Sequence, residues 1–289
     1  MQRRLSFFKK AITSSYVIRV NEILDDTIRP VLPDDLIIKV KSIFRSRGIC
    51  QIPVTNEGSK LVGTVKRYKF LKSSSKTSAM LVQDVLEEVL LYTCIKTEIK
   101  EITEEMLQRR EDCIPVIEDE QNKRYSGILS LENVMDALTK INTELLNSKV
   151  IDVVKKNKGF CYSDDTLFKV WEKMKEENTN GLFVLDKDKK VVGVITHYDV
   201  LIAKIPGLNI ALENHKESNY ITVNKIMNKN VIKIRPNCTI IEAAKTMLKY
   251  KISRLPIVGS NNEYLGSITK DDIVKYLLCL LYTSPSPRD

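Results

Sequence analysis

The sequence contains one motif four times over, and this internal repetition limits the possible folds more than any other feature. The motif is an apolar run, a polar turn, a second apolar run around a glycine and a short polar stretch, as in LPIVGSNNEYLGSITKDDI at 255–273. Related segments begin at Ile52, Ile114 and Leu182. Because a repeated sequence forms a repeated structure, we expect several similar small units rather than one large domain.

A second pattern precedes each copy of the motif. Apolar residues recur there at intervals of three and four, which is the spacing of one buried face of an amphipathic helix. Each stripe begins 15 residues before its motif. The stripes are Ile37, Val40 and Phe44; Ile99, Ile102 and Met106; Leu167, Val170, Trp171 and Met174; and Ile240, Ala243, Ala244 and Met247. The sequence therefore predicts a helix before every motif, with Trp171 packed in the core.

Each repeat is predicted to have the element order β-α-β-β-α. In the last copy the predicted elements are a strand at Val231–Ile234, a helix that starts with a Thr239–Glu242 capping box, a hairpin of Leu255–Val258 with Leu265–Ile268, and a second helix from Thr269. A unit of about 60 residues buries too little surface to be stable alone. We therefore expect a mixed α/β (α+β) fold in which four repeats pack as two pairs.

The boundaries between repeats are predicted in polar or irregular segments, such as SSSKTS at 73–78, Asn142–Ser148 and Pro206–Tyr220. The ending YTSPSPRD has no counterpart in the repeats. The predicted division is a lead-in helical segment at 1–19, repeats at 20–78, 79–143 and 144–206, a linker and fourth repeat at 207–281, and a disordered or artefactual tail at 282–289.

Composition and charge exclude several classes of protein. Hydrophobic residues make up 43% and charged residues 29% of the chain, which is typical of globular domains and excludes a coiled coil or a wholly disordered chain. The net charge is +9, and most of the excess lies after residue 145, so an anionic partner is expected there. Nucleic-acid binding ranks low, because the sequence shows neither a dense Lys/Arg stripe nor an aromatic stacking set.

Residues that carry chemistry are sparse. There are six cysteines and two histidines, without a C-x-x-C pair, a P-loop or a nucleophile beside a base, so we expect neither a metal site nor an enzyme. The longest apolar run, near Leu277–Tyr282, is far shorter than the ~20 residues that span a bilayer. We expect a soluble cytoplasmic protein whose cysteines are small buried apolar residues in a reducing setting.

The repeat resembles the cystathionine β-synthase (CBS) domain. The resemblance rests on an h-P-h-h strand, where h is apolar, followed by G-h-h-[ST]-x-x-D-h, and it covers residues 20–281. Four tandem copies resemble two Bateman modules, which are pairs of CBS domains. The plan is similar to that of the gamma subunit of AMP-activated protein kinase and of free-standing CBS proteins of archaea and bacteria. The resemblance implies a regulatory ligand, either an adenine nucleotide (AMP, ADP or ATP) or S-adenosylmethionine, in a cleft between paired repeats.

The resemblance assigns two residues of a repeat to this ligand. In the fourth repeat they are Thr269 and Asp272, and in the third they are Thr196 and Asp199. A threonine at a helix start favours a phosphate, because backbone N–H groups and the helix dipole attract anions. An ionised carboxylate accepts strong hydrogen bonds from ribose hydroxyls. The same spacing is also close to a capping box, which needs no ligand.

The first two repeats depart from this pattern. The second has Ser130 and Asn133, which are weaker candidates because a neutral amide replaces the carboxylate. The first has Lys66 and Lys69, which carry no acceptor, so it is expected to lack the ribose contact. Ligand binding is therefore expected mainly in the third and fourth repeats.

Further contacts are expected around these pairs. Arg254 matches a basic residue that reaches a phosphate in family members, and its alternative is a solvated surface arginine. His197 is expected to be an exposed helix residue, and Phe183, in place of a proline, to narrow the third cleft. The backbone and apolar walls for an adenine are expected from Val231, Ile232, Lys233 and Ile257 in the fourth repeat, and from Gly159, Phe160, Cys161 and Val184 in the third.

These features favour a regulatory, energy-sensing protein that binds an adenine nucleotide and transmits its ligand state to an unidentified partner protein. Neither catalysis nor a catalytic cofactor is expected. The alternative is an interaction scaffold whose clefts are empty. A monomer and a homodimer are both compatible with four repeats.

Overall fold

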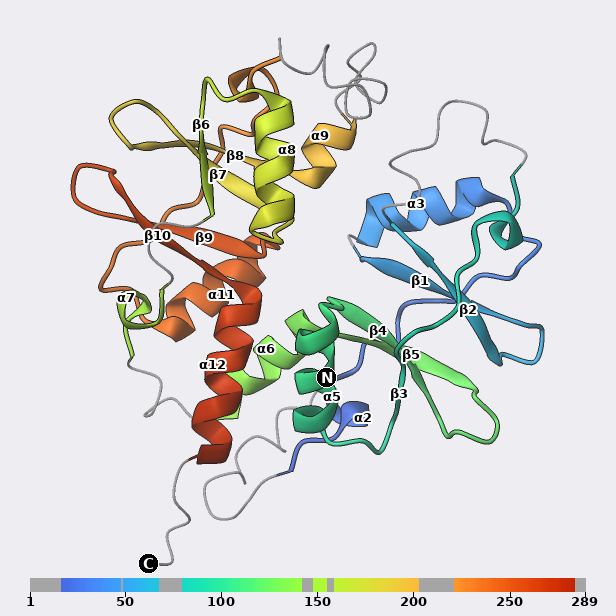
Figure 1. Ribbon diagram of the computed structural model, residues 1–289. Coiled ribbons are helices and arrows are strands. Elements are labelled where there is room, and N and C mark those ends of the chain that lie inside the picture. The colour runs from blue at the N-terminus through green and yellow to red at the C-terminus, as the bar shows by residue number, and fades with distance from the viewer. Residues whose placement is uncertain are drawn as a thin grey trace, which may run out of the picture. The chain divides into compact units, whose positions relative to one another are not determined.

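The computed structural model describes residues 17–47, 49–67, 80–141, 148–154, 159–202 and 221–283. It is a mixed fold of helices and small sheets, as predicted (Figure 1). The chain divides into two compact units, Met1–Leu145 with Ile273–Asp289, and Leu146–Asp272. Outside the described residues lie most of the predicted lead-in segment, the linkers at 73–78 and 206–220, most of the 142–148 boundary, and the tail from 284.

The first unit contains repeats 1 and 2. Repeat 1 consists of α3 (Ile37–Arg47), β1 (Gln51–Thr55) and β2 (Leu61–Lys66), and repeat 2 of β3 (Thr93–Cys94), α5 (Ile99–Arg109), β4 (Cys113–Ile117), β5 (Tyr125–Ser130) and α6 (Leu131–Ile141). Short helical turns, α2 (Val20–Ile23) and η2 (Val82–Val85), precede them. Both hairpins are antiparallel, and β3 adds to β4 in parallel.

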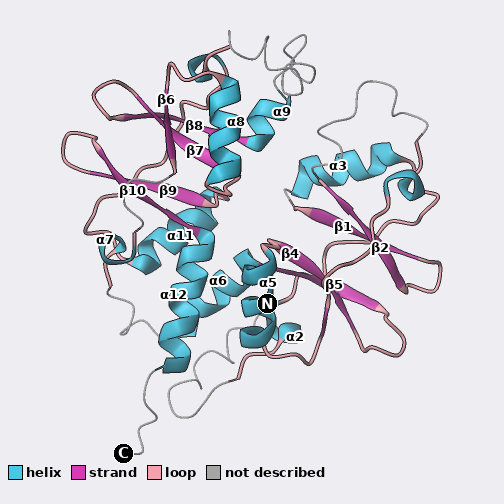
Figure 2. Ribbon diagram, in the orientation of Figure 1, coloured by secondary structure: helices cyan, strands magenta, loops and turns pink. Residues whose placement is uncertain are grey.

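The second unit contains repeats 3 and 4 and alternates helices with strands in the same order (Figure 2). Repeat 3 consists of β6 (Phe160–Tyr162), α8 (Leu167–Glu176), β7 (Gly181–Leu185), β8 (Val191–Thr196) and α9 (His197–Ile202), and repeat 4 of α11 (Ile240–Tyr250), β9 (Arg254–Val258), β10 (Tyr264–Thr269) and the start of α12 (Lys270–Thr283). The preceding turns are α7 (Val150–Val153) and η4 (Val223–Lys225). The predicted hairpins are confirmed.

The predicted first strand of repeat 4 is wrong in extent. Val231–Ile234 does not form a strand, and only Ile234 pairs, in a single parallel bridge with Ile257. The neighbouring strand holds Pro256, which has no N–H to donate to a longer ladder. Repeat 3 has Phe183 at that position, and there the strand β6 forms three residue pairs.

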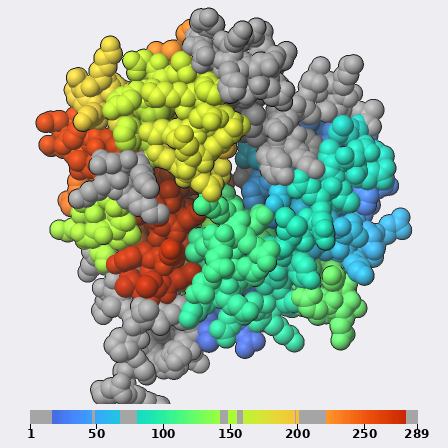
Figure 3. Space-filling model, in the orientation of Figure 1, coloured from blue at the N-terminus to red at the C-terminus, as the bar shows by residue number. Residues whose placement is uncertain are grey.

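The helix stripes form the cores, as their spacing predicts. In repeat 3, Leu167, Val170 and Met174 pack against Leu182 and Ile195 of the hairpin, and the equivalent stripe residues of the other repeats are also buried. Trp171 is partly buried against the same cluster. The opposite side of α8 is exposed and forms part of the surface seen in yellow-green in Figure 3.

The lead-in turns are exchanged between the two repeats of each pair. The N–H of Val20 in α2 donates to the Thr97 carbonyl of repeat 2 (3.0 Å), whereas the N–H of Val82 in η2 donates to the Asp35 carbonyl of repeat 1 (2.9 Å). In the second unit α7 bonds repeat 4, and η4 bonds repeat 3. Each repeat is thus completed by a segment of its neighbour, which shows that repeats 1 and 2, and repeats 3 and 4, are the paired units.

The recurrent glycine of the motif makes room for this exchange. A Cβ atom on Gly127 of β5 would lie 2.7 Å from the carbonyl oxygen of Asp25 in the segment that follows α2. The backbone of Asp25 pairs with Ile128 of the same strand through two hydrogen bonds, of 2.8 and 3.0 Å. A side chain at this position would therefore hold the exchanged segment away from the sheet.

The prediction that all six cysteines are free, small, buried apolar residues is confirmed for Cys161 alone and is wrong for the other five. Cys50 and Cys113 form a disulfide across a sequence separation of 63 residues. Of the other four, only Cys161 is buried, and burial raises the pKa of its thiol to about 12. The sequence lacks any local signal for the disulfide, because the two cysteines meet only when repeats 1 and 2 pair.

Candidate functional site

The third and fourth repeats each carry a hydroxyl and a carboxylate at the junction of a strand and a helix. In repeat 4 the Thr269 hydroxyl donates to Asp272 Oδ2 over 2.6 Å, and the Asp272 N–H donates back to Thr269 Oγ1 over 3.3 Å. In repeat 3 the same bonds join Thr196 and Asp199 over 2.6 and 3.2 Å. All four residues are half-buried.

These bonds are the capping interaction that the spacing also predicted. The same carboxylate oxygens accept the N–H of Thr269 (3.1 Å) and of Thr196 (2.8 Å). The cap uses only Oδ2 of each carboxylate, and an ionised carboxylate accepts about four hydrogen bonds in all. The cap by itself therefore does not use the full acceptor capacity of either carboxylate.

Repeat 2 shows that an asparagine completes the same cap. The Ser130 hydroxyl donates to Asn133 Oδ1 over 2.6 Å, and the Asn133 N–H donates back to Ser130 over 3.1 Å. The carboxylates of the last two repeats are thus not required for capping. In repeat 1, Lys66 ends β2 at the position of the threonine, and Lys69 lies outside the described residues.

Arg254 crosses from repeat 4 to repeat 3. Its backbone pairs with Thr269 in the hairpin, but its guanidinium donates to the Thr179 hydroxyl (3.1 Å) and to the Gly181 carbonyl. A Cβ atom on Gly181 would lie 3.2 Å from Arg254 Cζ and 3.1 Å from Thr196 Cγ2. The guanidinium therefore lies beside the threonine of repeat 3, although sequence reasoning had grouped Arg254 with Thr269 and Asp272.

His197 is the first residue after Thr196, and the expectation that it is exposed is wrong. The residue is half-buried, and its ring centre is 4.7 Å from that of Trp171. Its Nε2 is buried, with no hydrogen-bond partner among the described residues. Burial, and then the charge of Arg254, hold the pKa of His197 below its usual value. A neutral imidazole and a guanidinium thus lie at the junction of repeats 3 and 4.

The predicted adenine wall of repeat 4 has an unpaired backbone edge. The Ile234 N–H donates to the Pro256 carbonyl (3.1 Å), but Pro256 has no N–H to return to the Ile232 carbonyl. Within the described part of the chain that carbonyl accepts no hydrogen bond. In repeat 3 the equivalent bond exists, from the Phe183 N–H to the Gly159 carbonyl (2.8 Å). The two walls therefore differ in the backbone groups that they offer.

The other wall residues of repeat 4 point in different directions. Lys233 Nζ donates to the Val191 carbonyl of repeat 3 over 2.8 Å. Val231 is half-buried and packs against an apolar cluster that includes Val191 and Val258. Ile257 is wholly buried, so only the segment 231–233 is partly accessible.

The predicted wall of repeat 3 is largely filled by the fourth repeat. The ring of Phe160 packs on Tyr264 of β10, with ring centres 5.5 Å apart, and Phe183 packs on the same tyrosine at 6.2 Å. The Gly159 N–H donates to the Glu177 carboxylate (2.9 Å), and Val184 is wholly buried in the core. Burial raises the pKa of Tyr264 to about 12. Of the two sites, repeat 4 thus retains more accessible polar backbone.

Sequence reasoning missed Thr179, Glu177 and Tyr264, which lie outside the repeated motif residues. Tyr264 stands two residues before the motif glycine, at the position that Tyr125 occupies in repeat 2. That recurrence was the available signal. No comparable signal marked Thr179 or Glu177.

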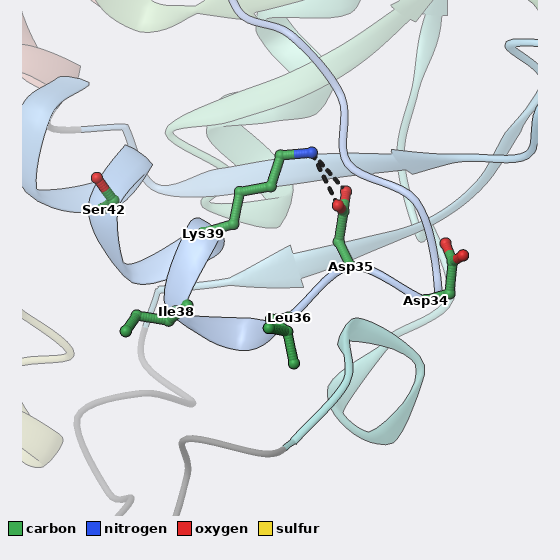
Figure 4. A pocket seen from close by; sticks show the side chains of 6 residues that line it. All are labelled: Asp34, Asp35, Leu36, Ile38, Lys39 and Ser42. Atoms are coloured by element: carbon green, nitrogen blue, oxygen red, sulfur yellow. Dashed lines mark hydrogen bonds and ion pairs between the residues drawn. The ribbon is translucent and has the colours of Figure 1, made fainter.

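A surface pocket lies elsewhere, at the start of α3 in repeat 1. It is lined by Asp34, Asp35, Leu36, Ile38, Lys39 and Ser42 (Figure 4). Lys39 is paired with Asp35 at 2.7 Å, so the lining carries excess negative charge and does not suit a phosphate. Among the described residues no cluster of His, Cys, Asp and Glu could hold a metal ion. None of the described helices has the length and apolarity needed to cross a membrane.

Comparison with known families identifies the repeat. The sequence model of the CBS domain matches residues 82–140, 150–205 and 223–279, which is more than half of the chain. The chain therefore belongs to the CBS domain family. The first repeat lies outside these three ranges, but it has the same stripe helix and hairpin as the others.

Relatives of this chain differ in how much of their length is matched. It is 29% identical over 162 residues to the uncharacterized protein MJ1426 of Methanocaldococcus jannaschii, covering 48% of this chain and 95% of that protein. It is 35% identical over 124 residues to a homoserine O-acetyltransferase of Methanosphaera stadtmanae, covering 43% of this chain but only 24% of the enzyme. The chain thus spans about a quarter of that enzyme.

A solved structure shows the same arrangement of elements. The crystal structure of protein MJ1225 from Methanocaldococcus jannaschii, which was proposed to be an archaeal homologue of g-AMPK, superposes with a TM-score of 0.69. The match covers 90% of this chain and 99% of that one, at 22% identity. At this identity the similarity shows the fold alone.

Proposed function

We propose that this protein is a non-catalytic regulatory sensor of adenine nucleotides, with its ligand held between repeats 3 and 4. The observation that carries the proposal is the pair of half-buried hydroxyl–carboxylate groups, Thr196–Asp199 and Thr269–Asp272, joined by an arginine that spans the two repeats. A nucleotide presents a phosphate and a ribose diol, which need a cation with N–H donors and an ionised acceptor respectively.

The roles of the residues follow from their chemistry. Thr269 and the first N–H groups of α12 would receive a phosphate, and Asp272 the ribose hydroxyls. Arg254 would supply a positive charge to either repeat, because its hydrogen bonds to Thr179 and Gly181 can be exchanged for bonds to a phosphate. The unpaired carbonyl of Ile232 is a suitable acceptor for the exocyclic amine of adenine.

The unequal walls favour repeat 4 as the tighter site. In repeat 3 the Gly159 carbonyl and N–H are already bonded to Phe183 and Glu177. A base there would have to break those bonds and displace Tyr264 from Phe160. A ligand in repeat 4 would accept hydrogen bonds from Arg254 in place of Thr179 and Gly181, and this exchange would change the contact between the two repeats. We propose that a partner protein responds to this change, since a ligand shifts an equilibrium only by binding its states differently.

The test is ligand-induced stabilisation, monitored by the fluorescence of Trp171, the single tryptophan. A saturating ligand at 100 times its dissociation constant stabilises the fold by about 2.7 kcal/mol. AMP, ADP, ATP, S-adenosylmethionine and adenosine are compared on the wild-type chain. We expect at least one nucleotide to raise the unfolding midpoint.

The decisive variant is Asp272→Asn, because Asn133 shows that an asparagine preserves the cap. We expect an intact fold and a strongly reduced ligand shift. Arg254→Gln should weaken phosphorylated ligands but not adenosine or S-adenosylmethionine, which carry no phosphate. The matched control is Asp136→Asn, an exposed ion-pair residue on α6. Unmoved midpoints with every ligand, or a full shift in Asp272→Asn, would reject the sensor in favour of the scaffold.

A further inference from the structure

Buried polar side chains form hydrogen bonds at the contact between repeats 1 and 2. Gln51, the first residue of β1, is 3% exposed. Its side-chain amide donates to the Cys113 carbonyl in β4, and its Oε1 accepts the Thr64 hydroxyl over 2.8 Å. The two first strands of the hairpins are therefore tied to each other through one glutamine.

A disulfide lies at the same contact. Cys50 immediately precedes Gln51, and it is bonded to Cys113 at the start of β4. The bond is embedded in an apolar cluster with Ile28, Ile128 and the partly buried Tyr125, whose hydroxyl donates to the Ile28 carbonyl over 2.9 Å. The pairing of the repeats is thus covalent on this side of the first unit.

An ion pair occupies the position that would receive a phosphate in repeat 1. Lys66 stands where the other repeats carry a hydroxyl, and its Nζ lies 2.6 Å from Glu111 Oε1. The two side chains are only 19% and 20% exposed. Glu111 belongs to repeat 2 and lies two residues before Cys113. A phosphate approaching Lys66 would have to displace this carboxylate, which is already paired in a largely buried setting.

We propose that the first pair of repeats is a redox-dependent clasp rather than a ligand site. By clasp we mean a contact between repeats 1 and 2 whose strength depends on whether the Cys50–Cys113 disulfide is formed. In a reducing compartment a disulfide is rare, and where one occurs it is usually transient and takes part in catalysis or redox sensing. The inference is independent of nucleotide binding, which concerns repeats 3 and 4.

The chemical step requires a dithiol reductant. A thiolate of the reductant attacks one sulfur of the disulfide and forms a mixed disulfide, which releases the other cysteine as a thiolate that takes up a proton. The second thiol of the reductant then attacks the mixed disulfide. Two electrons pass to the protein, which gains two thiols, and the reductant leaves as a cyclic disulfide. Without the covalent bond, β1 and β4 keep the Gln51 contacts, the nearby Lys66–Glu111 pair and apolar packing, and the exchanged lead-in turns still join the two repeats.

The first experiment counts thiols in the full chain purified without reductant. In denaturant without reductant, an alkylating reagent should label four of the six cysteines, and peptide mass spectrometry should find Cys50 linked to Cys113. After treatment with dithiothreitol all six should react. Six reactive thiols before reduction would overturn the proposal.

The second experiment measures what the bond does. Dithiothreitol should lower the unfolding midpoint followed by far-UV circular dichroism by about 10 °C for the first unit, and should leave the Trp171 fluorescence transition of the second unit in place. Amide exchange of Gln51–Thr55 and Cys113–Ile117 should become faster. Cys50→Ser should show the reduced behaviour with or without dithiol.

The matched control is Cys94→Ser in the same unit, whose thiol lies outside the disulfide and which should retain the response to dithiol. If Cys50→Ser fails to fold, the wild-type chain with and without dithiothreitol still decides the question. An unchanged midpoint and unchanged exchange after reduction would reject the clasp. A nucleotide-dependent shift of Trp171 that survives reduction would leave the proposed sensor function standing even if the clasp fails.

Discussion

The two pairs of repeats join their members at the same position by different chemistry. Cys113 opens β4 in the first pair and Arg254 opens β9 in the second, and the side chain of each bonds to the neighbouring repeat. In the first pair the link is covalent. In the second it consists of hydrogen bonds from a guanidinium to Thr179 and Gly181.

The difference separates a covalent contact, which only a reductant breaks, from a hydrogen-bonded contact whose partners can be exchanged. Closing a loop of 63 residues by a disulfide is worth about 4 kcal/mol in the chain-entropy description. A hydrogen bond to a charged group contributes about 1.5–3 kcal/mol, and a phosphate can replace its acceptor. A pair held by Arg254 can therefore respond to an anionic ligand, whereas a pair held by Cys113 responds to reductants.

The largest expected effect tests whether the two pairs are independent. Met106 in α5 and Met174 in α8 occupy the same position in the stripe and are 0% and 1% exposed. Met106→Ala and Met174→Ala should each cost about 2–5 kcal/mol of unfolding free energy, because each leaves a cavity. In urea denaturation, Met174→Ala should shift the Trp171 fluorescence transition, and Met106→Ala should shift only the circular dichroism transition.

The control for these variants is Leu90→Ala, since Leu90 is 67% exposed. Its effect should stay within about 0.5 kcal/mol. Equal shifts of the Trp171 unfolding transition by Met106→Ala and Met174→Ala would show that the two pairs unfold together. That result would contradict the view that they are independent.

The success of the helix and hairpin predictions has a local cause. The Thr239–Glu242 capping box forms as predicted, with hydrogen bonds of 2.8 and 3.2 Å, because its residues are three apart. The stripe of Ile240, Ala243, Ala244 and Met247 is buried for the same reason. Short-range periodicity and capping are properties of a single helix, and they hold wherever that helix packs.

The failures concern contacts between repeats. The Cys50–Cys113 bond, the reach of Arg254 to Gly181 and the exchanged lead-in turns join residues that are tens of positions apart. A helical or strand period says which face is buried but not which neighbour covers it. His197 was misjudged for a similar reason, since the ring of Trp171 packs against it from another helix.

A smaller effect is expected from the exchange glycines, and it differs between the pairs. Gly127→Ala places a methyl group 2.7 Å from the backbone oxygen of Asp25 and should cost about 1–3 kcal/mol, because a paired backbone cannot move aside easily. In Gly193→Ala the nearest atoms belong to the flexible side chain of Met227, so the loss should be smaller. Both are measured by urea denaturation.

The control is Gly58→Ala, where the nearest atom is the Asn56 side-chain oxygen at 3.4 Å. This variant should have little effect. A loss in Gly193→Ala as large as in Gly127→Ala would mean that Met227 is held as rigidly as backbone, and the two exchange contacts would then be equivalent.

The smallest expected effect is a pH dependence confined to the second pair. The folded state keeps His197 neutral below the usual imidazole pKa, through burial and then the charge of Arg254. As the pH falls below about 6.5, the imidazole is protonated in the unfolded chain but stays neutral in the folded chain until a lower pH. Protonation therefore favours the unfolded state, and the stability of the second unit should decline. The two histidines are His197 and His215, so the first pair has none.

His197→Gln should remove part of this decline from the acid side of the stability profile. Because the imidazole lies against Trp171, fluorescence of the native chain should also report its protonation directly, with a midpoint below 6.5 that moves upward in Arg254→Gln. A midpoint that ignores the arginine would contradict the view that Arg254 and His197 share one junction between repeats 3 and 4. In that case the protonation of His197 would not affect the contact that Arg254 makes between repeats 3 and 4.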